Sequence, residues 1–448
     1  MQLENMTDKK FPLKKSLTGF EVELFTIDQK GRIVNGADIL LKKAKSDKNL
    51  TLKKEISLNL IEIASYPSET IQNTMFNLLR ELEYLVAIAN KENMLLCPLA
   101  LYPGKFEPTM NKDTRYEIKK SIFGKDKYKI EGRCAGFHCH YTLPRGIFDS
   151  ELRVLKMLTR SKIKDSFVNS YNLLIAADPA LTCFMQSSPF YQGRHIGKDS
   201  RVIMYRGGEA LNNKKGLYAD FEEFGGLPHY KLTAFDIMDI ITTRYEKWKS
   251  YIMSLGINIK VLSLYGSVLY TNWSPVRINA HGTIEQRGMD MNHPVYIAGI
   301  GVIIKHILKK LQEEFYAIVP SEIGIKEPFK VEGDVIYIPP FPYVRNELQR
   351  LSAYNGLESD VVHNYCKRFL KFAQSAMPRS SYTLIRVFQD MLNKKKTVSD
   401  EILGYARKKG WERKELLSGK LAAEIAIHHS ERLLDELIST RKLIKDLT

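Results

Sequence analysis

The stretch TGFEVELFTID, residues 18–28, alternates apolar and polar side chains with the period of a β-strand and places a strand at the start of the fold. Strand side chains point to opposite faces in turn, so Glu21 and Glu23 share one face, while Phe20 and Leu24 share the other. We expect the apolar face to join the core. Glu21 and Glu23 carry like charges and repel each other unless a positive group lies between them.

Two interpretations of this acidic pair are open. One is a solvated strand face, on which charged side chains need no partner. The other is a site for a divalent metal, because hard cations such as Mg²⁺ take carboxylate oxygens as ligands. The E-x-E pattern alone does not separate the two interpretations, so other charged clusters of the chain must.

A second acidic cluster lies in KKEISLNLIEIA, residues 53–64. Its apolar residues alternate as in a strand, and Glu62 falls where this pattern predicts a core residue. A buried carboxylate is costly unless it is paired or bound to a metal, so Glu62 is a candidate metal ligand. Glu55 has the opposite parity, and a regular strand would not present both acids on one face, whereas a bulge or a turn would.

Two further segments place charged or titratable side chains on one strand face. In GFHCHYTLP the alternating pair is His138 and His140, and in GTIEQRGMD it is Glu285 and Arg287. Hydrogen-bonded histidines and a surface ion pair are the alternatives. Together, the acids, imidazoles and arginine are the groups that phosphoryl transfer with two or more Mg²⁺ ions requires. The chain has no P-loop and no G-x-G-x-x-G motif, so a nucleotide would be held in another way.

The remaining pattern predicts an α+β fold with helices between antiparallel strands. Helical periodicity marks the segments 71–88, 151–185, 233–256, 295–319, most of the chain from about 345, and 419–446. Strand-like segments, besides the first, are 94–101, 134–143, 261–273, 282–290 and 335–341.

The chain of 448 residues is strongly basic, with a net charge of +16. Nucleic acid, anionic substrates such as nucleotides, or a Lys-rich proteome would each account for this charge. The lysines are spread along the chain, and no RNP, zinc-finger or zipper pattern accompanies them. We therefore expect no specific nucleic-acid partner.

The cysteines and the apolar segments limit the compartment. Five widely spaced cysteines without a C-x-x-C pair argue against a disulfide framework and against a zinc site. The N-terminal residues lack the apolar core of a signal peptide, and the longest apolar run, VYIAGIGVII, is shorter than the roughly 18 residues that span a bilayer. We expect a cytoplasmic protein with no membrane association.

The order of the motifs resembles that of the glutamine synthetase-like carboxylate–amine ligases, and among them the glutamate–cysteine ligase type 2 family. GFEVELFTID resembles the family's opening G-x-E-x-E-x-x-x-x-D strand, SSPFYQGRHIG its S-P-F-x-x-G-R loop, and TNWSPVRINAHGTIEQRGMD its W-x-x-R…G-T-[IV]-E-x-R-x-x-D block. The chain departs from the pattern at Gln286, where an aliphatic residue is usual, and in RVIMYRGGEALNN.

The resemblance implies an antiparallel sheet that forms a curved active-site funnel, with helices on the outside and a helical C-terminus. It implies that the metal ligands are five acids and a histidine: Glu21, Glu23, Glu55, Glu62, Glu285 and His138. Glu285 and Arg287 are the implied catalytic residues, with Arg287 stabilising the transferred phosphate. His140, Arg194 and Arg277 are implied to bind nucleotide or substrate.

The resemblance further implies an ATP-dependent ligase that forms an amide through an acyl phosphate, with two or three Mg²⁺ ions or Mn²⁺ as a substitute. The expected substrates are glutamate and cysteine, which would give γ-glutamylcysteine for glutathione biosynthesis. A ligase with a different amine acceptor and a non-catalytic nucleotide-binding homologue are the alternatives. We expect a catalytic domain over residues 1–390 and a helical extension packed on it over residues 391–448, and a homo-oligomer is compatible with the sequence.

Overall fold

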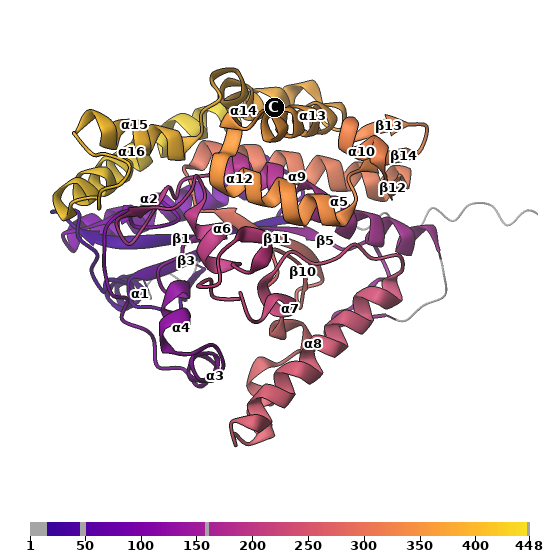
Figure 1. The fold of residues 1–448 in the computed structure, drawn as a ribbon, viewed down its shortest axis with the longest axis horizontal. Helices are drawn as coiled ribbons and strands as arrows, with labels where there is room; N and C mark the ends of the chain where they lie inside the picture. Colours follow the sequence, from indigo (N-terminus) through magenta and orange to yellow (C-terminus); the bar gives the residue numbers. More distant parts are fainter. Residues whose placement is uncertain (1–15, 45–50, 157–160, 446–448) are drawn as a thin grey trace, which may run out of the picture.

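The computed structural model describes residues 16–44, 51–156 and 161–445, and its central element is an antiparallel sheet (Figure 1). Its strands in spatial order are β10 (Val276–Asn279), β11 (Thr283–Asp290), β5 (Gly136–Thr142), β1 (Thr18–Asp28), β3 (Leu60–Ala64) and β2 (Leu52–Lys54), and β4 (Met94–Cys97) pairs with the second half of β1. All neighbouring strands in this sheet are antiparallel, which confirms the predicted fold class.

The strand order places the four motif-bearing strands, β11, β5, β1 and β3, next to one another at the centre of the sheet. Residues directly opposite each other on antiparallel neighbours point to the same face. The register joins three such pairs: Glu21 with His138, Glu23 with Glu62, and Glu285 with His140. The pairing therefore gathers these side chains on one face of the sheet.

The opposite face of the sheet is apolar and covered by helices. Phe20 and Leu24 are 1% and 0% exposed on this face. The helices α5 (Lys162–Met185) and α9 (Pro294–Glu314) pack over it (Figure 1). The contact is so close that a Cβ atom at Gly301 would lie 2.3 Å from Cζ of Phe20, so α9 can approach β1 only with glycine at this position.

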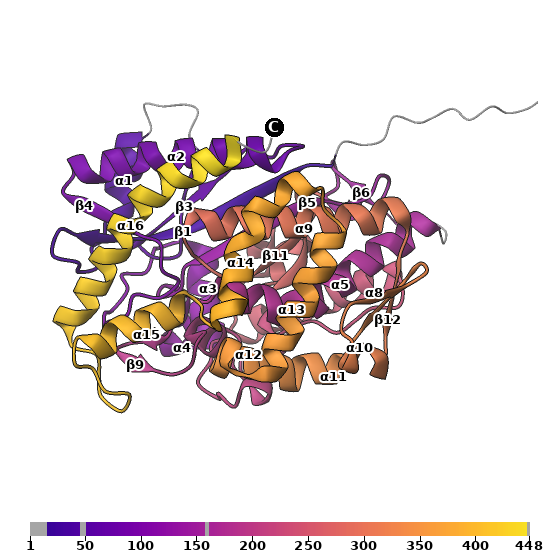
Figure 2. The ribbon, with the colours of Figure 1, turned by 90° about the horizontal axis from the view of Figure 1, so that it is seen from above.

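The helix α2 (Ile71–Lys91) begins where the sequence predicts it. Thr70 is the N-cap, and its side-chain oxygen accepts a hydrogen bond of 3.1 Å from the backbone N–H of Asn73. The predicted C-terminal helix is α16 (Gly419–Lys445), which packs against α2, β4 and α9 (Figure 2).

The other α-helices of the described residues lie around this core. In the first half of the chain they are α1 (Ala37–Ala44), α3 (Thr114–Phe123), α4 (Lys125–Glu131), α6 (Ser200–Tyr205) and α7 (Glu222–Gly225). In the second half they are α8 (Ala234–Ser254), α10 (Glu322–Lys326), α11 (Phe341–Tyr343), α12 (Gln349–Asn355), α13 (Asp360–Ser375), α14 (Tyr382–Lys394) and α15 (Val398–Lys408). The predicted helical C-terminal region is confirmed. The domain boundary predicted at residue 390 stays a prediction.

Short elements complete the chain. The 3₁₀ helices are η1 (Glu209–Leu211), η2 (Ile259–Tyr265), η3 (Val268–Thr271), η5 (Gly356–Glu358) and η6 (Arg379–Ser381), and η4 (Val344–Leu348) is a π-helical turn. The small sheets are β12 (Ala317–Pro320) with β14 (Val335–Ile338) and β13 (Lys330–Glu332), β6 (Phe148–Asp149) with β7 (Val154–Leu155), and β8 (Phe190–Tyr191) with β9 (Arg194–His195).

The strand predicted over residues 261–273 is wrong, because this segment forms η2 and η3. Its aromatic and β-branched residues are typical of a strand. However, Leu262 and Tyr265, the two buried residues of η2, lie three positions apart, which is the period of a 3₁₀ helix.

The strand-like alternation around Glu55 and Glu62 does not come from one continuous strand, because β2 and β3 form a hairpin whose connection holds Glu55. Strand parity therefore does not apply to Glu55. Of the two alternatives that the sequence allowed, a bulge or a turn, the chain adopts the turn.

The helix predicted over residues 151–185 begins only at Lys162, after the β6–β7 hairpin, and residues 157–160 lie outside the described part. The helix predicted to residue 319 ends at Glu314, where Phe315 has a left-handed φ of 58°. No helix among the described residues is long and apolar enough to cross a bilayer. All five cysteines are buried and unpaired.

Candidate active site

The polar face of the sheet borders a cavity of about 130 Å³. It is lined mainly by charged side chains: Glu21, Glu23, Glu55, Ile56, Glu62, Glu131, Cys134, His138, Arg201, Tyr205, Arg277 and Arg287. Two more of the predicted site residues lie against it, because Glu285 faces His138 and His140 faces Glu21.

His138 lies between two groups of acids. Its Nδ1 is 3.1 Å from Oε2 of Glu21 and 3.9 Å from Oε1 of Glu285. Its Nε2 is 3.6 Å from Oε1 of Glu23, and Glu62 belongs to the same group. In each group, one ligand atom from each of the three residues lies within 4.8 Å of the others, so one cation could contact all three.

The carboxyl groups on the Glu23 side of the cavity hold their protons unusually strongly. Burial raises the pKa of Glu23 to about 7, and the charge of Glu62 adds to this effect against the opposing charge of Arg201. Burial also raises the pKa of Glu55 to about 7, followed by the charge of Glu23. The pKa of Glu62 lies well above its ordinary value because of burial and the charges of Glu21 and Glu55. The positive side chains nearby therefore do not balance the negative charge that these three carboxyl groups would carry if all were ionised.

Glu21 behaves in the opposite way. Burial raises its pKa, but the charge of His140 and hydrogen bonds with His138 outweigh burial and hold the pKa well below the ordinary value. The ammonium group of Lys53 lies 2.9 Å from Oε1 of Glu21 and 2.8 Å from Oε1 of Glu62. This half-exposed lysine therefore bridges the two acids across the β1–β3 pair.

The donor set fits a divalent cation. Burial lowers the pKa of His138 to about 4, followed by the charge of Arg287, so the imidazole is neutral at pH 7. Neutral imidazole is the form that binds metals. The Nε2 atom of His138 is buried and has no hydrogen-bond partner in the described structure. Carboxylate oxygens with one free imidazole nitrogen suit Mg²⁺ or, better, Mn²⁺.

Glu285 accepts hydrogen bonds from two side chains of the neighbouring strand β10. Arg277 donates hydrogen bonds of 2.6 Å from Nε to Oε2 and 3.1 Å from Nη2 to Oε1, and Asn279 donates one of 2.6 Å to Oε2. Burial raises the pKa of Glu285, but Arg277, His140 and Arg287 lower it well below its ordinary value. Glu285 is therefore ionised, and its Oε1 also lies 3.7 Å from Nε of Arg287.

His140 lies two residues beyond His138 on β5, on the same face of the sheet. Its Nδ1 is 3.0 Å from Oγ1 of Thr283, and its Nε2 is 3.5 Å from Oε2 of Glu21. Burial lowers the pKa of His140, but the charges of Glu285 and Glu21 raise it above the ordinary value. His140 is thus the more basic of the two histidines and His138 is the one suited to a metal.

Arg194 is the one predicted site residue that the structure does not bring to the cavity. It lies in β9, in the short β8–β9 hairpin, with an exposed side chain, and it is not among the cavity residues. The binding role that the resemblance implies for Arg194 stays a prediction.

Arg201, Asn279 and Lys53 are among the residues of the site that sequence reasoning missed. Arg201 lies in α6, is 5% exposed, and lines the cavity, where its charge lowers the pKa of Glu23. A charged residue in the otherwise apolar segment SRVIMY was the available signal. Asn279 shares the strand parity of Arg277, so the same rule would have found it. Lys53 gave no signal, because it is one of many lysines in a Lys-rich stretch.

The departure at Gln286 has a structural explanation. Gln286 points to the helix-covered face of the sheet, where its Nε2 donates a hydrogen bond of 3.0 Å to Oδ1 of Asp178 on α5. Asp178 is fully buried and is also paired with Arg206. The glutamine therefore serves a buried polar network behind the sheet and does not line the cavity.

A family model described as glutamate–cysteine ligase family 2 matches residues 17–262. The chain belongs to this family. The matched region includes β1, β3 and β5, whereas β10 and β11, which carry Arg277, Glu285 and Arg287, follow it. A comparison with curated proteins found no match.

Two solved structures share the fold. A glutamate–cysteine ligase from Francisella tularensis in complex with AMP superposes with a TM-score of 0.56 at 13% identity, over 97% of both chains. A bifunctional glutathione synthetase from Pasteurella multocida gives a TM-score of 0.52 at 12% identity over 94% of this chain. The chain spans about half of that second protein, 53% of its length.

Proposed function

We propose that the protein is an ATP- and Mg²⁺-dependent ligase that joins a carboxylate to an amine, with glutamate as the carboxylate and cysteine as the amine. Membership in glutamate–cysteine ligase family 2 supports the substrate pair. The AMP bound to the Francisella tularensis ligase, which has the same fold, supports the use of an adenine nucleotide.

The observation that carries the proposal is the position of His138 between two acid groups, Glu21 with Glu285 on one side and Glu23 with Glu62 on the other. Each pair of acids would hold one divalent cation, with the free Nε2 of His138 as a further ligand on the Glu23 and Glu62 side. Glu55 is a further carboxyl beside that second pair. When bound, Mg²⁺ or Mn²⁺ supplies positive charge that offsets the charge of the ATP phosphates.

Arg287 would stabilise the phosphoryl group in transfer. Its guanidinium lines the cavity, lies beside Glu285, and remains charged, because Glu285 raises its pKa against the effect of burial. A fixed cation aimed at developing negative charge in a water-poor site lowers the barrier of such a step. Arg201 lines the same cavity and would add a second guanidinium for the phosphates.

The proposed reaction has two steps. A carboxylate oxygen attacks the γ-phosphorus of ATP, the bond to the β-phosphate oxygen breaks, and an acyl phosphate and ADP form. The amine then attacks the acyl carbon, the C–O bond to phosphate breaks, and the amine loses a proton as the amide forms. The binding roles implied for His140, Arg194 and Arg277 belong to this proposal, as do the two or three metal ions.

The test is a phosphate-release assay with ATP and MgCl₂, first with glutamate alone and then with glutamate and each candidate amine. The product is identified by mass spectrometry. Release that requires glutamate and cysteine together and yields γ-glutamylcysteine is the expected result. Glu23→Gln and Arg287→Met are expected to lower the rate by about 100-fold or more. Glu117→Gln, on the exposed face of α3, is the matched control.

Each other outcome changes a defined part of the proposal. Turnover with a different amine keeps the chemistry and replaces cysteine. ATP binding without turnover for any pair overturns the ligase proposal in favour of a nucleotide-binding homologue.

A further inference from the structure

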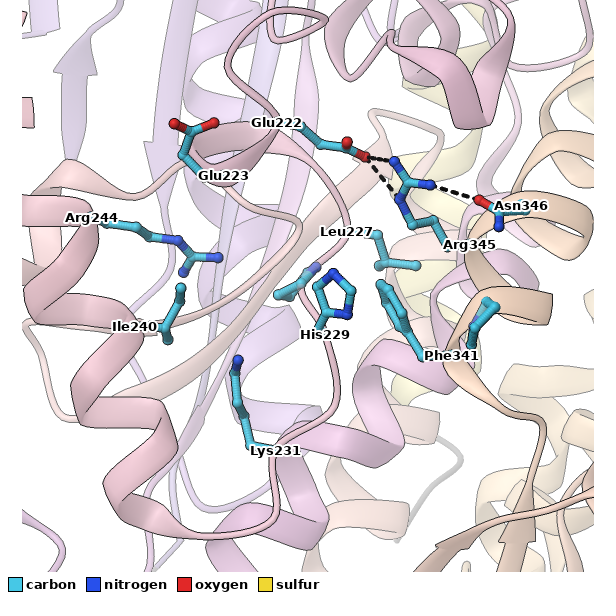
Figure 3. Close-up of a pocket in the computed structure, with 12 residues that line it drawn as sticks. Glu222, Glu223, Leu227, His229, Lys231, Ile240, Arg244, Phe341, Arg345 and Asn346 are labelled. Carbon is cyan, nitrogen blue, oxygen red and sulfur yellow. Dashed lines mark hydrogen bonds and ion pairs between the residues drawn. The ribbon is translucent and has the colours of Figure 1, made fainter. Parts of the chain in front are cut away.

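A second and larger cavity, of about 380 Å³, is lined by other residues than the acidic site, and Figure 3 shows its lining. It is lined by residues of α7, of the following segment to Lys231, and of α8, α11 and η4. No residue lines both cavities. The first residues of α7, Glu222 and Glu223, line this cavity. Gly225, at the end of the same helix, lines a small gap that Arg287 also lines. The single turn of α7 therefore separates that gap from this cavity. Its volume lies in the range of small-molecule sites, roughly 300–1,000 Å³.

Arg244 of α8 points into this cavity, as Figure 3 shows. It is 4% exposed, and its Nε and Nη1 atoms have no hydrogen-bond partner among the described residues. Its interaction partner is the hydroxyl of Tyr171, with the charge of Glu223 as a weaker influence. Buried polar groups nearly always have partners, so two free nitrogens on a buried guanidinium require an explanation.

Another buried arginine of the chain shows what a structural role looks like. Arg206 is also 4% exposed, but its Nη1 and Nη2 donate hydrogen bonds of 2.6 Å and 2.9 Å to Asp178, and Nη1 donates another of 2.7 Å to Gln349. Among the described residues, Arg244 has no such carboxylate partner. Its Nε and Nη1 atoms are buried beside the cavity that the residue lines.

A second cation faces Arg244. Lys231 points into the same cavity (Figure 3), and burial followed by the charge of Arg244 lowers its pKa. Among the described residues, no carboxylate forms an ion pair with Lys231. The acids of the cavity are already engaged, Glu222 with Arg345 and Glu223 with Lys247. The cavity therefore has two positive groups in excess.

Another part of the lining is aromatic and apolar. The imidazole of His229 and the ring of Phe341 lie with their centroids 4.1 Å apart and their planes at 38°, and Leu227 and Ile240 extend this surface. Such a wall suits a ring or an apolar chain, whereas Arg244 and Lys231 suit an oxyanion.

We propose that this cavity binds a small molecule that carries one phosphate or carboxylate group on a ring or apolar body, with the oxyanion held between Arg244 and Lys231. The ligand would bring negative charge to Arg244 and relieve its repulsion with Lys231. Its body would lie against His229 and Phe341. This site is separate from the ligase cavity and does not depend on the proposed reaction.

The test is isothermal titration of the full chain with phenyl phosphate, benzoate, inorganic phosphate and phenol as probes. We expect saturable binding of phenyl phosphate, with phenol weaker by about 10-fold or more because it lacks the charge. Whichever of phenyl phosphate and benzoate binds more tightly shows whether the site prefers a phosphate or a carboxylate group. Inorganic phosphate should bind more weakly than phenyl phosphate, because it lacks the ring. Failure of both to bind, or phenol binding as tightly as either, overturns the proposal.

Variants locate the binding. Lys231→Met and Arg244→Lys are expected to weaken phenyl phosphate by about 10-fold or more, and their folding is checked by thermal unfolding. Lys249→Met is the matched control, because Lys249 lies on α8 with Arg244 but outside the cavity. This variant should bind as wild type does. Arg287→Met tests the other cavity. Binding that is lost in Arg287→Met and kept in Lys231→Met would place the probe in the acidic site and overturn the proposal.

Discussion

Arg277 and Glu285 lie directly opposite each other on β10 and β11, and two hydrogen bonds of 2.6 Å and 3.1 Å join the guanidinium to the carboxylate. Glu285 is fully buried beside His138, and Arg277 is the largest of the charges that keep this acid ionised. The arginine thus fixes the charge and the orientation of a candidate metal ligand.

Arg277→Met is expected to lower the free energy of unfolding by about 3–5 kcal/mol, because it leaves the buried Glu285 charge with Asn279 as its remaining hydrogen-bond donor. Urea unfolding measures the change. Arg350→Met, which breaks an exposed pair with Glu347, is the control and should change stability by less than about 1 kcal/mol. Equal stability of Arg277→Met and wild type would contradict this account of the pair.

MnCl₂ is expected to stabilise the protein through the Glu23 and Glu62 group. A cation that binds only the folded chain adds about 2.7 kcal/mol at 100 times its dissociation constant. Thermal unfolding with and without MnCl₂ measures the shift, and Glu62→Gln should remove most of it. Glu117→Gln should keep the full shift. A shift of the same size in Glu62→Gln would show that the ion binds elsewhere.

The pH dependence of stability should report the protons held by Glu23. Its pKa is about 7 in the folded chain, raised by burial, against an ordinary value near 4.5. The folded chain therefore binds more protons than the unfolded chain between these values, and this group makes the free energy of unfolding fall as the pH rises from about 5 to 8.

Glu23→Gln cannot ionise and should lack this part of the slope. Urea unfolding in EDTA from pH 5.5 to 8.5 is the measurement, and wild type should lose stability relative to Glu23→Gln as the pH rises. Added MnCl₂ should remove the difference in slope, because bound metal holds the carboxylate in its deprotonated form. Parallel pH curves without metal would rule out a raised pKa at Glu23.

Gly136→Ala should damage the site without unfolding the chain. The backbone N–H of Gly136 donates a hydrogen bond of 2.6 Å to Glu23, and a Cβ atom there would lie 2.5 Å from Nη2 of Arg201 and 3.2 Å from Nε2 of His138. Both side chains would have to move, so we expect metal affinity to fall by about 10-fold or more. Titration with MnCl₂ measures it. Gly404→Ala, in a helix with open space around it, should leave metal affinity unchanged.

The sequence predicted which side chains share a face within each strand. Alternation placed Glu21 with Glu23, and Glu285 with Arg287, and both pairs lie on the cavity side. It could not show that the strands are neighbours, because parity within one strand carries no information about the order of strands in a sheet. The resemblance to a family supplied that step.

Other features depend on contacts between segments far apart in the chain. Lys53 bridges Glu21 and Glu62 only because the β2–β3 hairpin folds back, and no local pattern distinguishes it from its neighbouring lysines. The cavity around Arg244 unites α8 with η4, which are about a hundred residues apart, so no single motif predicts it.

The most direct test of the central claim is oxygen transfer from the carboxylate substrate to phosphate. Glutamate labelled with ¹⁸O in its γ-carboxylate is incubated with ATP, MgCl₂ and cysteine, and the released phosphate is analysed by mass spectrometry. Activation as an acyl phosphate predicts one ¹⁸O atom in each phosphate released, and loss of this signal in Arg287→Met. Phosphate that forms at the wild-type rate but carries only oxygen from ATP and water would contradict the ligase account.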